Sequence, residues 1–239
     1  MPNASTLLLV PGLMCDASSW GGVPSALPGV DCRVVDHGQA DSLVQMAEQL
    51  LAQAPARFAL AGHSMGGRVA LEVMRIAPER VTHLGLFDTG HLPKAAGAAG
   101  DEEVRKRMAL LAIAREQGVR AMASEWVKGM VAPHRLVDRP LIDAILGMFE
   151  RKSADIFERQ LRALIQRPDA TPVLAQIRVP TLVLCGELDA WSPPAQHQAM
   201  ANCIAARPAV VSITDCGHMA MQEQPEAVAA AMRQWLSAD

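Results

Sequence analysis

The segment Ala61–Gly67 has the sequence AGHSMGG and constrains the fold of this chain more than any other. It follows a short apolar run and precedes a stretch with a helical pattern. The spacing G-x-S-x-G between a strand and a helix is typical of a turn so tight that the serine backbone is strained and its hydroxyl projects from the sheet edge. Gly62 and Gly66 fit this interpretation, because a Cβ at either position would collide with the neighbouring strand or helix. We therefore expect Ser64 to be displayed at the end of a strand in an α/β fold.

The composition narrows the class of protein. At 239 residues, half of them hydrophobic, the chain is long enough for one large α/β domain with its own core. Aromatic residues make up only 3% and tyrosine is absent, which argues against a stacking surface for single-stranded nucleic acid. A net charge of −3 without a long basic run also argues against a nucleic-acid partner. The five cysteines are widely spaced without a C-x-x-C or His/Cys cluster, which predicts reduced thiols and no metal site.

The N-terminal residues 1–6 lack the basic residues of a signal peptide, and the apolar run after them is only four residues long. No stretch approaches the ~20 consecutive apolar residues of a membrane span. The expectation is a cytoplasmic protein without a membrane partner.

Short apolar runs alternate with helical patterns along most of the chain, which predicts βαβ units and a mostly parallel, doubly wound sheet of about six strands. The runs are apolar throughout, as expected of strands that are buried on both faces. The predicted strands are Thr6–Val10, Asp31–Val35, Phe58–Ala61, Val81–Phe87, Thr181–Leu184 and Ala209–Ile213. The predicted helices between them are Ala17–Leu27, Ser42–Ala54, Met65–Ile76, Pro194–Ile204 and Pro225–Ser237, with Ser42 and Ser192 as candidate N-caps.

This alternation stops between His91 and about Ala175, a stretch without a convincing strand. We interpret residues 91–175 as a helical cap, inserted in a loop at the carboxyl ends of the strands, and residues 1–90 with 176–239 as the core domain. The cap carries four helical patterns, at about Glu102–Gln117, Val119–Met130, Arg139–Arg151 and Ser153–Gln166.

A serine nucleophile needs an adjacent base that a third group orients. His218 follows the last predicted strand, and Asp189 follows the strand before it, so that Ser64, Asp189 and His218 occur in the order of an α/β-hydrolase triad. Two other acids compete with Asp189 for the third role. Glu187 lies two residues earlier, and Asp88 follows the strand after the Ser64 helix.

With these motifs over nearly its whole length, the chain resembles the α/β-hydrolase superfamily, in the capped branch that includes small-molecule esterases and enol-lactonases. The segment Cys216–Pro225, C-G-H-M-A-x-x-E-Q-P, carries part of the resemblance. The resemblance implies an oxyanion hole formed by the backbone N–H groups of Leu13 and Met65. Pro11 replaces the histidine usual before the glycine of that loop, and the antiparallel strands that open many members are missing.

Apolar side chains of the predicted cap suggest an apolar substrate pocket, and we name Trp126, Met130 and Met148 as candidate lining residues. Basic side chains near the end of the cap are able to accept a substrate carboxylate or to form a solvated helix face. They are Arg151, Lys152, Arg159, Arg162 and Arg167.

The leading hypothesis is a serine hydrolase that cleaves a small, largely apolar carboxylic ester or lactone through an acyl-enzyme, with a small molecule as its partner. Carbon–carbon bond hydrolysis, thioester hydrolysis and a non-catalytic ligand receptor on the same scaffold remain alternatives. The chemistry needs no cofactor or metal, and the sequence leaves the oligomeric state open.

Overall fold

The computed structural model describes residues 6–238, in which six parallel strands form one sheet. The strands are β1 (Thr6–Val10), β2 (Asp31–Val34), β3 (Phe58–His63), β4 (Val81–Phe87), β5 (Thr181–Gly186) and β6 (Val210–Ile213). Their order is β2-β1-β3-β4-β5-β6, and every neighbouring pair is parallel. This arrangement confirms the predicted doubly wound sheet.

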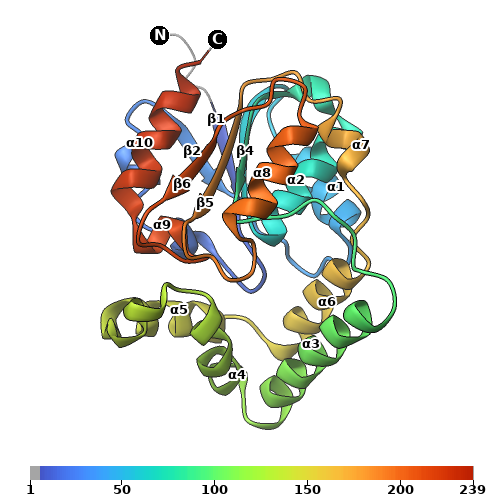
Figure 1. Cartoon of the computed structure of the whole chain (residues 1–239), viewed down its shortest axis with the longest axis vertical. Coiled ribbons are helices and arrows are strands. Elements are labelled where there is room, and N and C mark those ends of the chain that lie inside the picture. Colours follow the sequence, from blue (N-terminus) through green and yellow to red (C-terminus); the bar gives the residue numbers. More distant parts are fainter. Residues whose placement is uncertain (1–5, 239) are drawn as a thin grey trace.

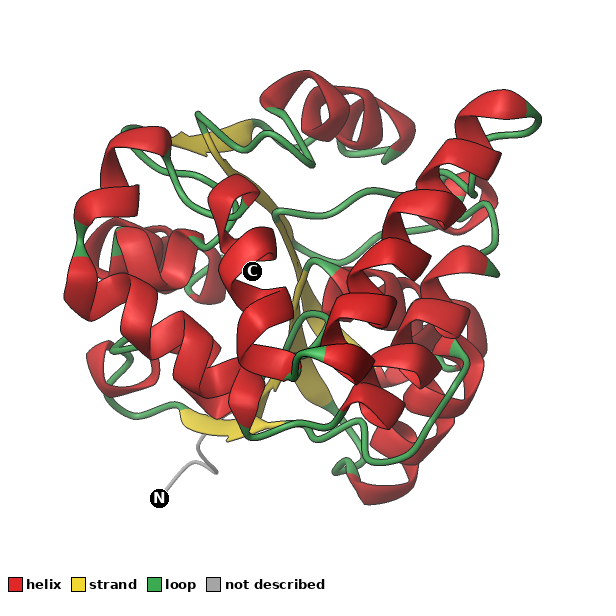
Figure 2. Ribbon diagram, turned by 90° about the horizontal axis from the view of Figure 1, so that it is seen from below, coloured by secondary structure: helices red, strands yellow, loops and turns green. Residues whose placement is uncertain are grey.

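Helices cover both faces of the sheet, as Figure 2 shows. Leu8 and Val10 of β1 point to a core shared with α1 (Leu43–Gln53), α2 (Met65–Ile76) and α8 (Pro194–Cys203). The alternate residues of β1 point to a second core with the short helix α9 (Ala220–Glu223) and with α10 (Pro225–Leu236). Because both faces are covered, the strands carry apolar residues at successive positions.

Between β4 and β5 the chain forms a helical insertion that lies below the sheet in Figure 1. Its helices are α3 (Ala98–Glu116), α4 (Val119–Trp126), α5 (Arg139–Glu150) and α6 (Ala154–Ile165), and the short helix α7 (Thr171–Leu174) leads back to β5. We keep the name cap for residues 91–175, the range that the sequence analysis defined.

Two local predictions were wrong. The stretch Ala17–Leu27 is no α-helix but two 3₁₀ turns, Ala17–Trp20 and Pro24–Ala26, because Gly21 between them adopts φ +51° and interrupts any helix. Ser192 does not cap α8 either. Its backbone N–H donates to Asp189, and the cap position of α8 is one residue later.

Ser42 does cap α1 as predicted, since its hydroxyl accepts a hydrogen bond from the Gln45 N–H at 3.2 Å. None of the helices in residues 6–238 combines the length and apolar character that a membrane crossing requires. Residues 1–5, on which the signal-peptide prediction rests, lie outside the described part of the chain.

Candidate active site

Ser64 lies at the sharp turn between β3 and α2 and has strained backbone angles, φ +53° and ψ −116°. Two glycines make this turn possible. A Cβ on Gly62 would lie 2.2 Å from the carbonyl oxygen of Gly66, and a Cβ on Gly66 would lie 2.1 Å from that of Val10. The N–H of Ser64 donates to the Phe87 carbonyl of the next strand at 2.9 Å. These contacts hold the Ser64 side chain at the carboxyl end of the sheet, as the motif predicts.

The structure brings Ser64, His218 and Asp189 together. His218 Nε2 lies 2.9 Å from Ser64 Oγ, and His218 Nδ1 lies 2.8 Å from Asp189 Oδ2. The other carboxylate oxygen of Asp189 accepts hydrogen bonds from the N–H groups of Trp191 and Ser192 at 2.8 and 2.9 Å. Burial opposes ionisation of Asp189, but His218 and these N–H groups outweigh it, so the pKa of the carboxyl lies below its usual value. A charged carboxylate therefore faces the imidazole.

Neither competing acid reaches His218. The Glu187 residue is exposed at the surface. Asp88 is fully buried, and its Oδ1 accepts a hydrogen bond from the N–H of Gly186 at 2.8 Å. Its Oδ2 has no hydrogen-bond partner within residues 6–238. Burial, followed by the nearby Asp189 charge, raises the pKa of Asp88 well above its usual value.

Two buried side chains position the loop that carries His218. His63 Nε2 lies 2.8 Å from the His218 carbonyl oxygen and donates to it. Burial and the neighbouring His218 lower the pKa of His63 to about 3, so that it stays neutral. Glu223 accepts hydrogen bonds from the N–H groups of Gly217, Met219 and, in the cap, Ala132. The sequence analysis missed this role of Glu223, although it lies within the segment C-G-H-M-A-x-x-E.

The candidate oxyanion hole lies beside Ser64. Within residues 6–238, the N–H groups of Leu13 and Met65 donate to no protein acceptor, and both residues line the cavity next to Ser64. Met14 follows with φ +62°, and its N–H donates to Gln160 Oε1 at 2.7 Å. Gln160 belongs to α6 of the cap and is buried. The sequence analysis missed Gln160, because no local pattern shows that α6 docks on this loop.

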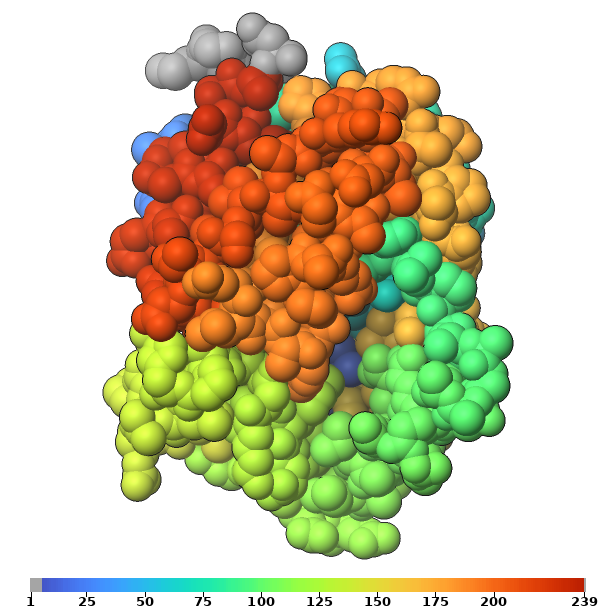
Figure 3. Space-filling model, viewed as in Figure 1, coloured from blue at the N-terminus to red at the C-terminus, as the bar shows by residue number. Residues whose placement is uncertain are grey.

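A cavity of about 610 Å³ opens at Ser64 and His218. In the space-filling view it is a hollow between the green cap helices and the orange segment near residue 190 (Figure 3). Trp126 and Met130 line it, whereas Met148 does not, because it packs in the hydrophobic core with none of its surface exposed. Trp126 stacks on Trp191, with ring centroids 5.5 Å apart, and this pair forms an apolar wall next to the imidazole of His218.

Most of the predicted basic residues bind the cap to the core. Arg151 pairs with Asp16, Lys152 with Asp36 and Arg162 with Asp41, while Arg159 donates to the carbonyl of Gln39. Arg167 alone of the five lines the cavity. The cavity also contains four charged residues that the sequence analysis did not single out, namely Arg68, Glu103, Lys106 and Arg107.

The described residues contain no cluster of His, Cys, Asp or Glu side chains suited to a metal ion. All five cysteines are free thiols, and burial raises the pKa of Cys15 and of Cys185 to about 12. The Ser64 hydroxyl and the His218 imidazole both line the cavity.

Comparison of the sequence with known protein families and curated proteins identifies relatives of this chain. A model of the alpha/beta hydrolase family matches residues 7–231. The dihydrolipoyllysine-residue acetyltransferase component of the acetoin cleaving system of Pseudomonas putida is 30% identical over 206 residues. That match covers 84% of this chain and 51% of the relative, so the chain spans about half the length of this curated protein.

Solved structures agree with this fold. A thermophilic esterase from Thermogutta terrifontis, solved with malate bound, has a TM-score of 0.83 and 29% identity over 97% of this chain and 89% of that one. The enol-lactonase from Burkholderia xenovorans LB400 has a TM-score of 0.82 and 22% identity over 99% and 92% of the two chains, which shows a shared fold. With a family match over almost its whole length, the chain belongs to the alpha/beta hydrolase family.

Proposed function

We propose that this protein is a serine hydrolase that cleaves a small, largely apolar carboxylic ester or lactone through an acyl-enzyme. One observation carries the proposal. The hydrogen-bonded series Ser64–His218–Asp189 opens directly into a cavity of about 610 Å³, a volume within the usual range for small-molecule sites. The likeness to an esterase at 29% identity over nearly the whole chain supports the same conclusion.

Each residue has a defined role in this mechanism. His218 Nε2 removes the proton from Ser64 Oγ as the oxygen attacks the carbonyl carbon, and then delivers it to the leaving alcohol. Asp189 keeps the imidazole in the tautomer with the proton on Nδ1 and stabilises the imidazolium. Water, activated by the same histidine, then hydrolyses the acyl-enzyme and restores Ser64.

The N–H groups of Leu13 and Met65 are proposed to stabilise the oxyanion. Both belong to backbone that the fold holds rigidly, one after β1 and the other at the first residue of α2. Preorganised donors of this kind lower the barrier, and loss of one typically costs about 10²- to 10³-fold in rate. We further propose that residues 91–175 act as a cap whose Trp126 and Met130 bind the apolar part of the substrate.

The test compares release of p-nitrophenol from acetate, butyrate and octanoate esters by the wild type and by Ser64→Ala. Turnover should disappear in Ser64→Ala and persist in the control Ser212→Ala, which changes an exposed serine of β6. Asp189→Asn should lower kcat by about 10⁴-fold because the tautomer is lost. A severe loss in Asp88→Asn with a mild one in Asp189→Asn would show that the acid is wrongly assigned.

Retention of more than a few per cent of activity in purified Ser64→Ala would refute the acyl-enzyme mechanism. A wild type that releases no product from esters, but whose melting temperature rises with added ligand, would instead identify a receptor on the hydrolase scaffold. Thioesters and vinylogous diketones as further substrates separate the remaining reactions that the same triad supports.

A further inference from the structure

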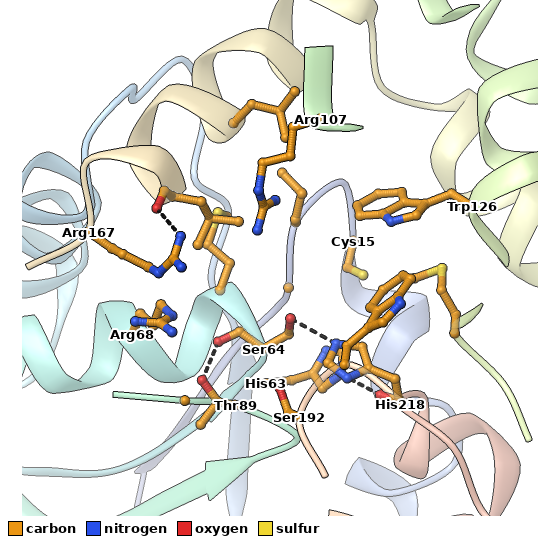
Figure 4. A pocket seen from close by; sticks show the side chains of 18 of the residues that line it. Cys15, His63, Ser64, Arg68, Thr89, Arg107, Trp126, Arg167, Ser192 and His218 are labelled. Atoms are coloured by element: carbon orange, nitrogen blue, oxygen red, sulfur yellow. Dashed lines mark hydrogen bonds between the residues drawn. The ribbon is translucent and has the colours of Figure 1, made fainter. Parts of the chain in front are cut away.

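Three arginines from three different elements meet at one end of the cavity. Arg68 lies in α2, Arg107 in α3 of the cap, and Arg167 just after α6. All three line the cavity that contains Ser64. Figure 4 shows Arg68 and Arg167 on the same side of Ser64, with Arg107 reaching toward them from the cap.

A single carboxylate, Glu103, balances this group. Arg167 binds it with two parallel hydrogen bonds of 2.6 and 2.8 Å, and Arg107 Nε donates to one of its oxygens at 3.0 Å. Burial opposes ionisation of Glu103, but the hydrogen bonds from Arg167 and the charge of Arg107 outweigh it and lower the pKa to about 2. The three arginines and Glu103 therefore leave an excess of two positive charges at this end of the cavity. Lys106, which also lines the cavity, is paired with Glu102 at 3.5 Å and is left out of this count.

Arg68 has the least compensated charge of the group. Its Nη1 donates to the carbonyl oxygen of Leu92 at 2.9 Å, and it makes no ion pair with any carboxylate in residues 6–238. Burial, with the neighbouring Arg167, lowers the pKa of Arg68 to about 9, so the guanidinium remains charged at neutral pH. A half-buried cation without an anionic partner is unfavourable, and an anion entering the cavity offsets that cost.

Arg68 lies in α2, the helix that begins directly after Ser64. Arg68 follows Ser64 by one turn of helix, a separation of roughly 6 Å along the axis. Leucine side chains of the cap form the wall of the same cavity, including Leu110, Leu161 and Leu164. A ligand that spans this cavity therefore meets an oxyanion hole at one end, an apolar wall along its length and a cationic group at the other end.

We propose that the substrate carries a carboxylate at the end remote from the scissile carbonyl, as in a half-ester of a short dicarboxylic acid, and that Arg68 and Arg107 bind it. This inference rests on the proposed function and names its substrate class. A carboxylate fits because the cluster already binds one, that of Glu103, in the two-pronged geometry that guanidinium groups favour. Arg107 uses Nε and Nη2 for Glu103 and Arg68 uses Nη1 for Leu92, which leaves Nη1 of Arg107 and Nη2 of Arg68 as donors for a second carboxylate.

The experiment measures kcat/KM for the monomethyl and dimethyl esters of succinate, glutarate and adipate, with proton release as the readout. The quantity compared is the ratio of the monoester rate to the diester rate, because a general loss of activity cancels in this ratio. The variants are Arg68→Gln and Arg107→Gln. The matched control is Arg115→Gln, which lies two turns after Arg107 in α3 and pairs with Glu158 at the surface.

The wild type should prefer at least one charged monoester, and each of the two cavity substitutions should lower that preference by roughly 10- to 100-fold, the usual worth of a hydrogen bond to a charged group. Arg115→Gln should keep the preference. Equal rates on monoester and diester in the wild type, or a preference that survives both substitutions, would overturn the proposal.

A binding measurement keeps this inference separate from the proposed function. Succinate and glutarate should raise the melting temperature of the wild type and of Arg115→Gln, but not that of Arg68→Gln. If no ester is cleaved but this pattern is found, the proposed function fails while the carboxylate site stands. Stabilisation by inorganic phosphate without stabilisation by either dicarboxylate would overturn the carboxylate assignment.

Discussion

Replacing Gln160 by leucine should damage catalysis although this side chain lies outside the catalytic triad. Gln160 is buried, and its Oε1 accepts the hydrogen bond from the Met14 N–H at 2.7 Å. Met14 has φ +62°, a conformation that persists in a non-glycine residue only where its surroundings enforce it. Its neighbour Leu13 supplies one of the two proposed oxyanion donors. The cap residue Gln160 therefore holds the backbone on which that donor depends.

The size of the expected losses in stability and in kcat follows from the hydrogen bond between the Met14 N–H and Gln160 that the substitution removes. Leucine leaves a buried N–H without a partner, which costs about 1–3 kcal/mol of the free energy of unfolding. Full loss of an oxyanion donor costs about 10²- to 10³-fold in kcat, and a displaced loop weakens the donor without removing it. We therefore expect kcat of Gln160→Leu to fall by about 10- to 100-fold. The KM should change less, because the donor stabilises the transition state more than the bound ester.

The assay combines urea unfolding with hydrolysis of p-nitrophenyl butyrate by the wild type, Gln160→Leu and the control Gln198→Leu. Gln198 is exposed on α8 and bonds only to Asn202 of the same helix, so its substitution should stay within about 0.5 kcal/mol and leave kcat unaltered. A stability loss in Gln160→Leu with an unchanged kcat would refute the reasoning, since the loop would then keep its geometry without this bond.

Two further predictions concern groups that the proposed mechanism does not use. The pKa of Asp88 is raised in the folded state, so the folded protein binds this proton more tightly than the unfolded chain does. The stability that the protonated Asp88 contributes is therefore complete below about pH 4. It is lost as the pH rises toward the folded pKa, by at most about 1.4 kcal/mol per pH unit. Asp88→Asn should therefore gain on the wild type between pH 5 and pH 8 in urea unfolding, and a difference independent of pH would contradict this. The second prediction concerns thiol labelling at pH 8. At most the two half-buried cysteines should react quickly in the folded protein, and all five should react after unfolding. Rapid labelling of four or more cysteines in the folded protein would contradict the burial of the other three thiols. The two are Cys32 and Cys203, and the protected thiols are Cys15, Cys185 and Cys216.

The strands and the reactive serine were predictable because their signals are local. Each strand is a short apolar run that is buried on both faces, and the six predicted runs agree with the observed strands to within two residues at each end. The turn at Ser64 was predictable because Gly62 and Gly66 are required by backbone clashes at 2.2 and 2.1 Å. The meeting of Asp189 and His218 also followed from topology, since the carboxyl ends of neighbouring parallel strands lie at one edge of a sheet.

The features of the site that the sequence did not predict concern the docking of one element on another. Met148 and Met130 both pack in the hydrophobic core, yet only Met130 also lines the cavity, because the orientation of each cap segment decides which side chains face the cavity. The arginine cluster was missed for the same reason. Arg107 reaches Glu103 within α3, but only the packing of the cap brings Arg167 to Glu103 and places both arginines in one cavity with Arg68.

Buried hydrogen bonds join the cap to both loops that the proposed mechanism uses. Gln160 accepts from the oxyanion loop, the N–H of His218 donates to the Met130 carbonyl at 2.7 Å, and Glu223 accepts from a cap N–H at 2.8 Å. Breaking such hydrogen bonds without replacing them costs about 1–3 kcal/mol of free energy each. Moving the whole cap away from the core would therefore be unfavourable and would disturb both loops at the same time. We therefore expect substrate to enter through the hollow beside α3 that Figure 3 shows. We also expect the cap to form a fixed part of the proposed site and not a freely moving lid.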